Sequence, residues 1–287
     1  MKIYVSTRVS VLTGAVLLSA LLTGAAPVAA AEDSHGARAT EEQPRESLPA
    51  RTDSTPAEQD RNLLLKIRQV NDDVFTSLQS FVCNEQIERF RGKAGSGDAR
   101  PIDTVVAKVS FENGVEHYMD IRQNNRQRPS ISSLSGAWSE GEFGTLLRQT
   151  QILLKAEPAM FQRYADVNGT SAAIYSFDVS EDDSPWDLEI SSKHFRIPFR
   201  TDIWVSRDSG QILRIERTST GVPWQMGISE IRWGVTLEPV EMNGRTWLLP
   251  KKGDYAVLYE DSGRREWNEM TFSNYHRYGS EVALRFQ

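Results

Sequence analysis

The stretch TDIWVSRDSGQILRIERT, residues Thr201–Thr218, predicts a β-hairpin. Two runs of β-branched and aromatic residues flank a short Asp/Ser/Gly turn, which is a strong hairpin signal. A three-residue loop, Asp208–Gly210, with Gly210 in the left-handed conformation makes one face of the hairpin aliphatic. The expected cross-strand pairs are then Val205 with Leu213, Ile203 with Ile215, and Trp204 with Arg214, whose guanidinium can lie on the indole. A two-residue loop would pair Val205 with Arg214, so side-chain chemistry favours the longer loop.

Strand signals continue on both sides of this hairpin. Apolar residues alternate with polar or small ones in Val105–Phe111 and in Ile231–Leu237. Further turns are expected at Asn113-Gly114, Asn168-Gly169, Asn243-Gly244, Lys252-Gly253 and Ser262-Gly263. About a dozen strands at short spacing predict a mainly β (α+β) antiparallel meander. Strands and helices do not alternate, which excludes a doubly wound nucleotide fold.

Two helices are expected to cover the sheet. The first runs from about Ala57 to Leu78, with Leu64, Ile67, Val74, Phe75 and Leu78 on its apolar stripe. The second contains Phe143, Leu146 and Leu147 and ends before Pro158, with Ser139 as the expected N-cap and Glu142 three residues later. The polar segment Arg126–Gly141 precedes it, and its length suits a mobile lid.

The N-terminus has the three-part layout of a secretory signal peptide, residues 1–31, with cleavage expected after Ala30 or Ala31. Residues 32–57 contain almost no large apolar side chains and are predicted to be a disordered spacer, and residues 58–287 a single domain. The apolar run is too short and interrupted for a stable membrane span, although a retained anchor stays open as an alternative. We therefore expect a periplasmic or secreted protein.

Charge and cysteine content narrow the class of protein. Residues 1–31 hold two basic and no acidic groups, so their removal changes the net charge from −6 to −8. A negative chain is a poor partner for nucleic acid or anionic membrane surfaces. Cys83 is the only cysteine, so no intramolecular disulfide forms, and a buried apolar role for it is the simpler interpretation.

Signatures of common enzyme classes are missing. There is no phosphate-binding glycine loop, HExxH, paired CxxC or G-x-S-x-G sequence. Turn chemistry explains Ser209 better than a nucleophilic role does. His117, His194 and His276 lack metal-ligand spacing, and the acidic run Glu181–Asp183 is better explained as a solvated turn than as a cation site. We expect no enzyme activity, no cofactor and no metal.

Three segments resemble a known superfamily. Ile203–Glu216 and the closing stretch Met270–Tyr278, MTFSNYHRY, are similar to the end of the lipoprotein-localisation carrier superfamily, which includes outer-membrane lipoprotein-sorting proteins. Phe81–Gly92, FVCNEQIERFRG, resembles the first strand of secreted bacterial proteins that share this ending. The resemblance implies an open antiparallel half-barrel that wraps one or two helices and can enclose acyl chains.

The leading functional hypothesis is a non-catalytic envelope protein that binds an apolar ligand, a lipid or a lipoprotein acyl chain, in the concave face of this sheet. The candidate pocket residues are Val109, Phe111, Leu146, Leu147, Val205, Leu213 and Trp233. Two alternatives remain open at this point. One is a structural or sensor module whose helices fill its own core, and the other is a hydrolase with an unrecognised site.

Overall fold

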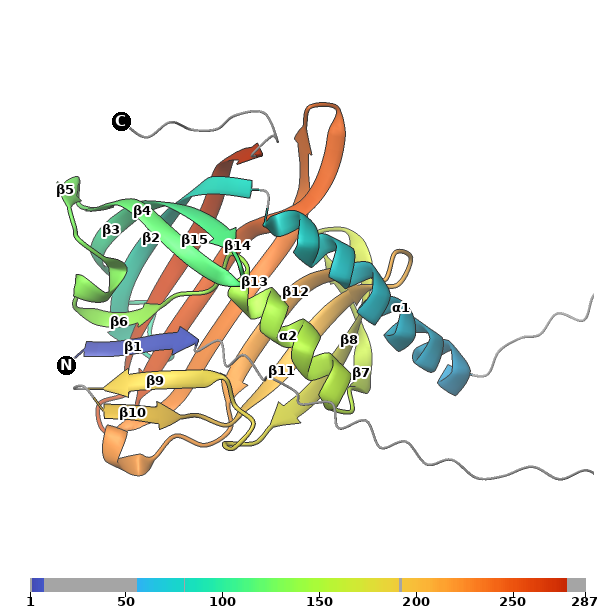
Figure 1. The fold of residues 1–287 in the computed structure, drawn as a ribbon. Helices are drawn as coiled ribbons and strands as arrows, with labels where there is room; N and C mark the ends of the chain where they lie inside the picture. The colour runs from blue at the N-terminus through green and yellow to red at the C-terminus, as the bar shows by residue number, and fades with distance from the viewer. Residues whose placement is uncertain (1, 8–55, 80, 191–192, 278–287) are drawn as a thin grey trace, which may run out of the picture.

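The computed structural model describes residues 2–7, 56–79, 81–190 and 193–277. Most strands belong to one open sheet of eleven antiparallel strands, not closed into a barrel (Figure 1). In spatial order these are β5 (Arg126–Gln127), β4 (Val115–Gln123), β3 (Arg100–Glu112), β2 (Phe81–Lys93), β15 (Arg264–Arg277), β14 (Arg245–Tyr259), β13 (Ile228–Met242), β12 (Ile212–Ser219), β11 (Phe199–Ser206), β8 (Thr170–Val179) and β7 (Met160–Val167). The expected half-barrel meander is confirmed.

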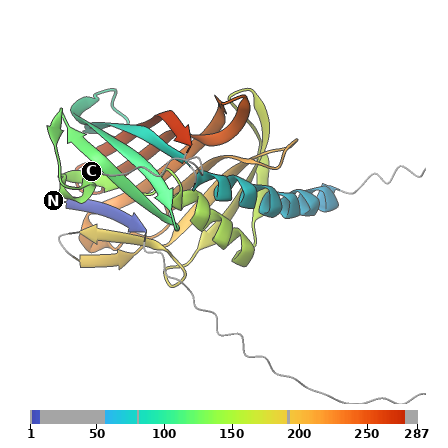
Figure 2. The same ribbon diagram turned by 45° about the horizontal axis from the view of Figure 1, so that its top comes forward.

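A second sheet of four strands was not expected. Its order is β10 (Lys193–Arg196), β9 (Trp186–Ile190), β1 (Lys2–Thr7) and β6 (Gly136–Ser139). β1 runs antiparallel to β9 and parallel to β6. Both views place this small sheet beside α2, over the same face of the large sheet (Figure 2).

Helices α1 (Pro56–Leu78) and α2 (Thr145–Ala156) lie across the inner face of the large sheet (Figure 1). The apolar stripe of α1 is as expected, because Ile67, Val74 and Leu78 are buried in the main core. Its fixed point is Asn71, whose side chain donates to the Gly210 carbonyl (3.0 Å) and accepts from the Ile212 amide (2.9 Å). These contacts tie α1 to the β11–β12 turn.

The β11–β12 hairpin confirms most of its expected register. Ile203 pairs with Ile215 and Trp204 with Arg214, whose guanidinium lies 5.7 Å from the indole centroid. Gly210 has a φ of 78°, in the left-handed region. The pairing of Val205 with Leu213 is wrong, because a bulge shifts the register and Val205 pairs with Ile212. Ile212 therefore enters the core cluster in place of Leu213.

Two other local expectations are corrected. The segment Arg126–Gly141 contains β5, a 3-10 turn at Ile131–Ser133 and β6, so it is not a continuous loop. Ser139 lies in β6, and α2 begins after Gly144. The Glu116 carboxylate of β4 caps α2 from outside the helix, since it accepts from the Gly144 (2.7 Å) and Thr145 (2.9 Å) amides.

Most of the expected turns are present, and one is not. Asn113, Asn168 and Asn243 all have positive φ and precede glycines with positive φ, as tight hairpin turns require. Lys252-Gly253 is not a turn but lies inside the long strand β14. A Cβ on Gly253 would lie 3.2 Å from the Met270 Cβ and 3.5 Å from the Glu142 Cγ, so the glycine permits close packing there.

At the N-terminus, Lys2–Thr7 of the expected signal peptide form β1. The remainder of that segment, residues 8–31, and the expected spacer up to residue 55 lie outside the described residues. None of the helices in the described part of the chain is both long and apolar enough to cross a membrane.

Candidate functional site: a polar row under α2

The seven residues expected to line a pocket are all buried, with at most 8% of any one exposed. They come from five elements: β3, α2, β11, β12 and β13. Val109 and Phe111 lie on β3, and four strands separate β3 from β12, which carries Leu213. Leu146 and Leu147 are buried residues of α2, which lies across the inner face of the sheet (Figure 1). Six of the seven belong to the main hydrophobic core, and Leu213 lies outside it because of the bulge.

The inner face also carries a continuous line of polar side chains across seven neighbouring strands. We call it the polar row: Thr201 (β11), Arg217 (β12), Trp233 (β13), Tyr255 (β14), Asn268 (β15), Arg89 (β2) and Asp103 (β3). Each member is paired in register with the next, so all lie on one face of the sheet. Except for Asp103, every member has at most 2% of its surface exposed.

An apolar row runs directly beside it. Its members lie two residues away from the members of the polar row, each on the same strand. In register order they are Ile203, Ile215, Val235, Gly253, Met270, Ile87 and Val105. This is the face that the sequence predicted for the core. The polar row therefore crosses the middle of the inner face, next to the apolar surface under the helices.

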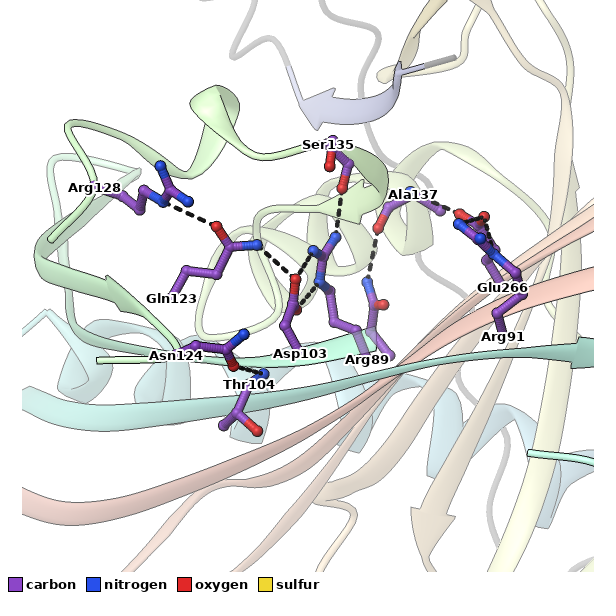
Figure 3. Close-up of polar contacts among 11 residues, drawn as sticks. Arg89, Arg91, Asp103, Thr104, Gln123, Asn124, Arg128, Ser135, Ala137 and Glu266 are labelled. Carbon is purple, nitrogen blue, oxygen red and sulfur yellow. Dashed lines mark hydrogen bonds and ion pairs between the residues drawn. The ribbon is translucent and has the colours of Figure 1, made fainter. Parts of the chain in front are cut away.

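At one end of the polar row, Arg89 is fully paired (Figure 3). Its guanidinium donates to both carboxylate oxygens of Asp103 and to the Ser135 carbonyl (2.6 Å), and it lies 4.3 Å from the centroid of the Trp138 ring. Gln123 also donates to Asp103. Burial opposes ionisation, but the hydrogen bonds from Arg89 hold the pKa of Asp103 below its usual value.

The same end fixes β6 to the sheet. Asn268 donates to the Ala137 carbonyl (3.2 Å), and Glu266 accepts from the Ala137 amide (3.1 Å) while it pairs with Arg91 (Figure 3). Both backbone polar groups of Ala137 are thus used by side chains of β15. This end of the row has a structural role, since it joins the two sheets.

At the other end, Arg217 has no carboxylate partner among the described residues. Its Nη1 donates to the Gln149 Oε1 (2.6 Å) and its Nη2 to the Thr150 Oγ1 (3.4 Å), both on α2. The guanidinium lies 4.6 Å from the Phe199 ring centroid and 5.9 Å from that of Trp233. Burial lowers the pKa of Arg217 to about 9, so the side chain keeps its charge at neutral pH.

Several buried donors at or near Arg217 lack a hydrogen-bond partner in the described ranges: Arg217 Nε, Gln149 Nε2, Thr201 Oγ1 and Trp186 Nε1. They belong to one cluster. Thr201 stands opposite Arg217, and Trp186 packs on Phe199 (5.4 Å between centroids) and stacks on Trp233 (6.1 Å). A cation surrounded by spare donors is the chemistry of an anion site.

A separate group of buried carboxylates includes the hydrogen-bond acceptor of the Trp233 indole. Glu142 accepts from the Trp233 Nε1 (2.6 Å), and its second oxygen has no partner among the described residues. Burial and the nearby Glu116 charge raise the pKa of Glu142 to about 8. Burial, and then the charge of Glu142, raise the pKa of Glu85 well above its usual value. Glu142 is therefore largely protonated at neutral pH.

The other residues considered for chemistry are dispersed. His117, His194 and His276 lie on β4, β10 and β15, which do not pair with one another. Within the described ranges, no three His, Cys, Asp or Glu side chains are arranged to hold a metal ion. Ser209 lies in the β11–β12 turn, where its Oγ accepts from the Gln211 amide (3.2 Å). Cys83 is buried, and burial raises the pKa of its thiol.

A cavity of about 630 Å³ lies at β2–β4, away from Arg217. Its lining is mixed, with Asn84, Thr104, Val106, Ala107, Lys108, Asp120, Arg122, Asn124 and Asn125. Lys108 and Asp120 form an exposed ion pair there (2.8 Å). Exposed pairs of this kind contribute little to stability or recognition.

Trp233 was predicted from the sequence as a candidate pocket residue, whereas Arg217, Thr201 and Gln149 were not singled out. One signal was available. Arg217 comes two residues after Ile215 and four after Leu213, and Arg89 comes two residues after Ile87 in the alternating run that begins at Phe81. Each arginine therefore occupies a position that strand alternation places on the core face. A charged residue at such a position marks either the end of the buried face or a buried site.

No protein-family model and no curated protein sequence matches this chain. Among solved structures, it is similar to a DUF1329 family protein from Desulfovibrio piger, at 13% identity and a TM-score of 0.38, with 80% of this chain and 96% of the other covered. It is also similar to a Vibrio parahaemolyticus domain described as an outer membrane lipoprotein-sorting protein domain. The identity is 8% and the TM-score 0.37, with 78% of this chain and 95% of the other covered. Mycobacterium tuberculosis lipoprotein LppX gives 12% identity, a TM-score of 0.28 and coverages of 75% and 96%.

At these identities and TM-scores, the matches do not identify a ligand or an activity for this chain.

Proposed function

We propose that this protein is an exported, non-catalytic binding protein of the cell envelope, and that its ligand is an anionic amphiphile. The ligand's carboxylate or phosphate is held by Arg217, and its apolar chain lies between the inner face of the sheet and α2. A fatty acid or an anionic lipid has this chemistry.

The observation that carries the proposal is the buried guanidinium of Arg217 without a carboxylate partner in the described part of the chain. Burial of an unpaired charge is costly, and buried arginines are ordinarily paired with an anion. Among the described residues, Arg217 has only an amide and a hydroxyl as acceptors, and spare donors of Thr201 and Trp186 lie nearby. An anionic head group satisfies all of these donors together.

The surroundings of Arg217 suit an apolar chain. Phe199 and Trp233 border the guanidinium, and Trp186 packs on both of these rings. Leu146 and Leu147 lie one turn before the acceptors of Arg217 on α2. Near the end of α2, Ile152 (54% exposed) and Met160 (56% exposed) present apolar side chains to solvent. In this proposal α2 shifts to admit the chain while the sheet stays fixed.

Thermal unfolding with laurate, with an uncharged dodecyl maltoside and with acetate tests this function, each amphiphile below its micellar concentration. The Arg217→Met variant is compared with Arg214→Met, a matched control on the same strand, because Arg214 pairs with Glu216 and Asp254 away from the core. Laurate is expected to raise the Tm of the wild type and of Arg214→Met, but not of Arg217→Met. Equal shifts for laurate in all three proteins would overturn the role of Arg217.

A second candidate is a structural or sensor module whose core is filled by its own helices. The burial of all seven expected pocket residues favours it. The same measurement separates the two candidates, since a self-filled module shows no laurate shift in any variant. Native mass spectrometry of protein purified from an envelope fraction adds an independent readout, because a binding protein carries a lipid-sized adduct that Arg217→Met loses.

Export rests on the leader expected at residues 1–31. N-terminal sequencing of the protein from its natural compartment is expected to begin at Ala31 or Glu32, or near Ala57 after protease trimming. A retained Lys2 would contradict export by cleavage.

A further inference from the structure

The small sheet contains a strand whose two neighbours are anchored independently of it. β1 lies between β6 and β9 in both views (Figures 1 and 2). Val5 is in register with Ser139 of β6 and with Leu188 of β9. The backbone of β1 thus has a strand partner on each side.

β6 keeps its place through the large sheet. Its Ala137 amide and carbonyl are bound by Glu266 and Asn268 of β15, and Trp138 lies under the Arg89 guanidinium. None of these contacts involves β1. β6 therefore remains fixed when β1 is absent.

β9 is held by a second set of contacts. Trp186 packs on Phe199 and Trp233, its amide donates to the Ser184 Oγ (3.1 Å), and its carbonyl accepts from the Ile197 amide (3.1 Å). β10 pairs along the far edge of β9. Without β1, two fixed edges would face each other across two strand spacings, roughly 9.5 Å.

Lys2–Thr7 fall within the leader expected from the sequence, so cleavage after Ala30 or Ala31 removes them. We propose that the mature protein has an open slot between β6 and β9, and that this slot binds an extended segment of a partner polypeptide. The segment runs parallel to β6 and antiparallel to β9 and completes the four-stranded sheet. Unpaired amides and carbonyls on both edges favour such an addition.

The lining of the slot indicates the partner's chemistry. Ala137, Trp138, Trp186 and Leu188 are all buried, with at most 2% exposed. A segment with uncharged β-branched and aromatic residues suits these neighbours. The chain's own spacer is a poor occupant, because residues 32–55 contain only one large apolar residue, Leu48, and two prolines.

The test uses the chain from Glu32 to Gln287 and a dye-labelled peptide with the sequence of residues 1–8. Fluorescence anisotropy is expected to show saturable binding, and a Val5→Pro peptide is expected to bind at least roughly tenfold more weakly, because proline removes a ladder donor. The chain of residues 1–287 is expected not to bind the peptide, since β1 fills its slot. Arg217→Met is expected to bind it as the wild type does, which separates this proposal from the proposed function.

Two further experiments check the register of the bound peptide and the presence of the slot in the folded protein. With Cys83→Ala, a Ser139→Cys protein is expected to form a disulfide with a Val5→Cys peptide in preference to an Ile3→Cys peptide, since Ile3 is in register with Ala137. In the second, a protease site after Ala31 is cut in the folded chain of residues 1–287. The released fragment is expected to stay bound until excess peptide of residues 1–8 displaces it. Immediate loss of the fragment without peptide binding, or equal affinity for the proline peptide, would overturn the proposal.

Discussion

Two buried arginines lie on the same row of the large sheet in opposite electrostatic situations. Arg89 meets a carboxylate, a carbonyl and an indole ring, and the contacts around it join two sheets. Arg217 meets an amide, a hydroxyl and two aromatic rings. Both are equally removed from solvent. Burial alone therefore does not define the role of a charged side chain. Its role depends on which hydrogen-bonding and charged partners it has and which it lacks.

Arg89→Met tests the structural end of the row and is expected to have the largest effect. It leaves the Asp103 carboxylate buried without its cation, which costs about 3–5 kcal/mol in the free energy of unfolding. Urea denaturation measures the loss. The double variant Arg89→Met/Asp103→Leu is expected to recover much of it, because no uncompensated charge remains. A single variant as stable as the wild type would remove the contrast between the two arginines.

Two carboxylates, Glu142 at Trp233 and Asp103 at Arg89, predict opposite pH dependence. Glu142 has an ordinary pKa near 4.5 and a folded pKa of about 8, so between these values the folded protein holds a proton that the unfolded chain has lost. The free energy of unfolding therefore falls as pH rises from about 5 to about 8. Asp103 has a lowered folded pKa, so its contribution is present at neutral pH and is lost only in acid.

Urea denaturation across this pH range, in wild type and in Glu142→Gln, checks the sign. The glutamine variant is expected to show a much smaller fall between about pH 5 and about pH 8, since its side chain does not ionise. An identical pH profile for both proteins would mean that Glu142 ionises in the folded state as easily as in the unfolded chain.

Gly210→Val perturbs the hairpin that carries Arg217 without changing the row itself. A β-branched residue would have to adopt a φ of 78°, and its Cβ would lie 3.0 Å from the Lys66 side chain. We expect a loss of about 1–2 kcal/mol. The laurate shift in Tm should persist, which makes this variant a destabilised control for Arg217→Met. Ser209→Ala, one residue earlier, should change stability by less than about 0.5 kcal/mol.

Arg217→Met is expected to change stability far less than Arg89→Met does. It removes hydrogen bonds to Gln149 and Thr150 and also removes the cost of burying an unpaired guanidinium. We expect the free energy of unfolding, measured in urea without added ligand, to change by no more than about 1 kcal/mol. A loss as large as that of Arg89→Met would show that both ends of the row are structural.

The sequence by itself determined the elements and the apolar face of the sheet. Alternation placed Ile203, Ile215 and Val235 on one face, and asparagine-glycine pairs fixed the turns, because both signals depend only on neighbours along the chain. The exceptions are also local. A bulge displaced Leu213, and Gly253 was interpreted as a turn although it serves close packing inside a strand.

Tertiary structure alone decided the polar row and its unequal ends. Arg89 and Arg217 lie 128 positions apart in the sequence, and four strand registers must be known before they fall on one line. Which of the two receives a carboxylate depends on β3 reaching Arg89 and on α2 presenting only Gln149 and Thr150 to Arg217. Electrostatic partners across a sheet are set by long-range register, and short-range sequence patterns carry no record of that register.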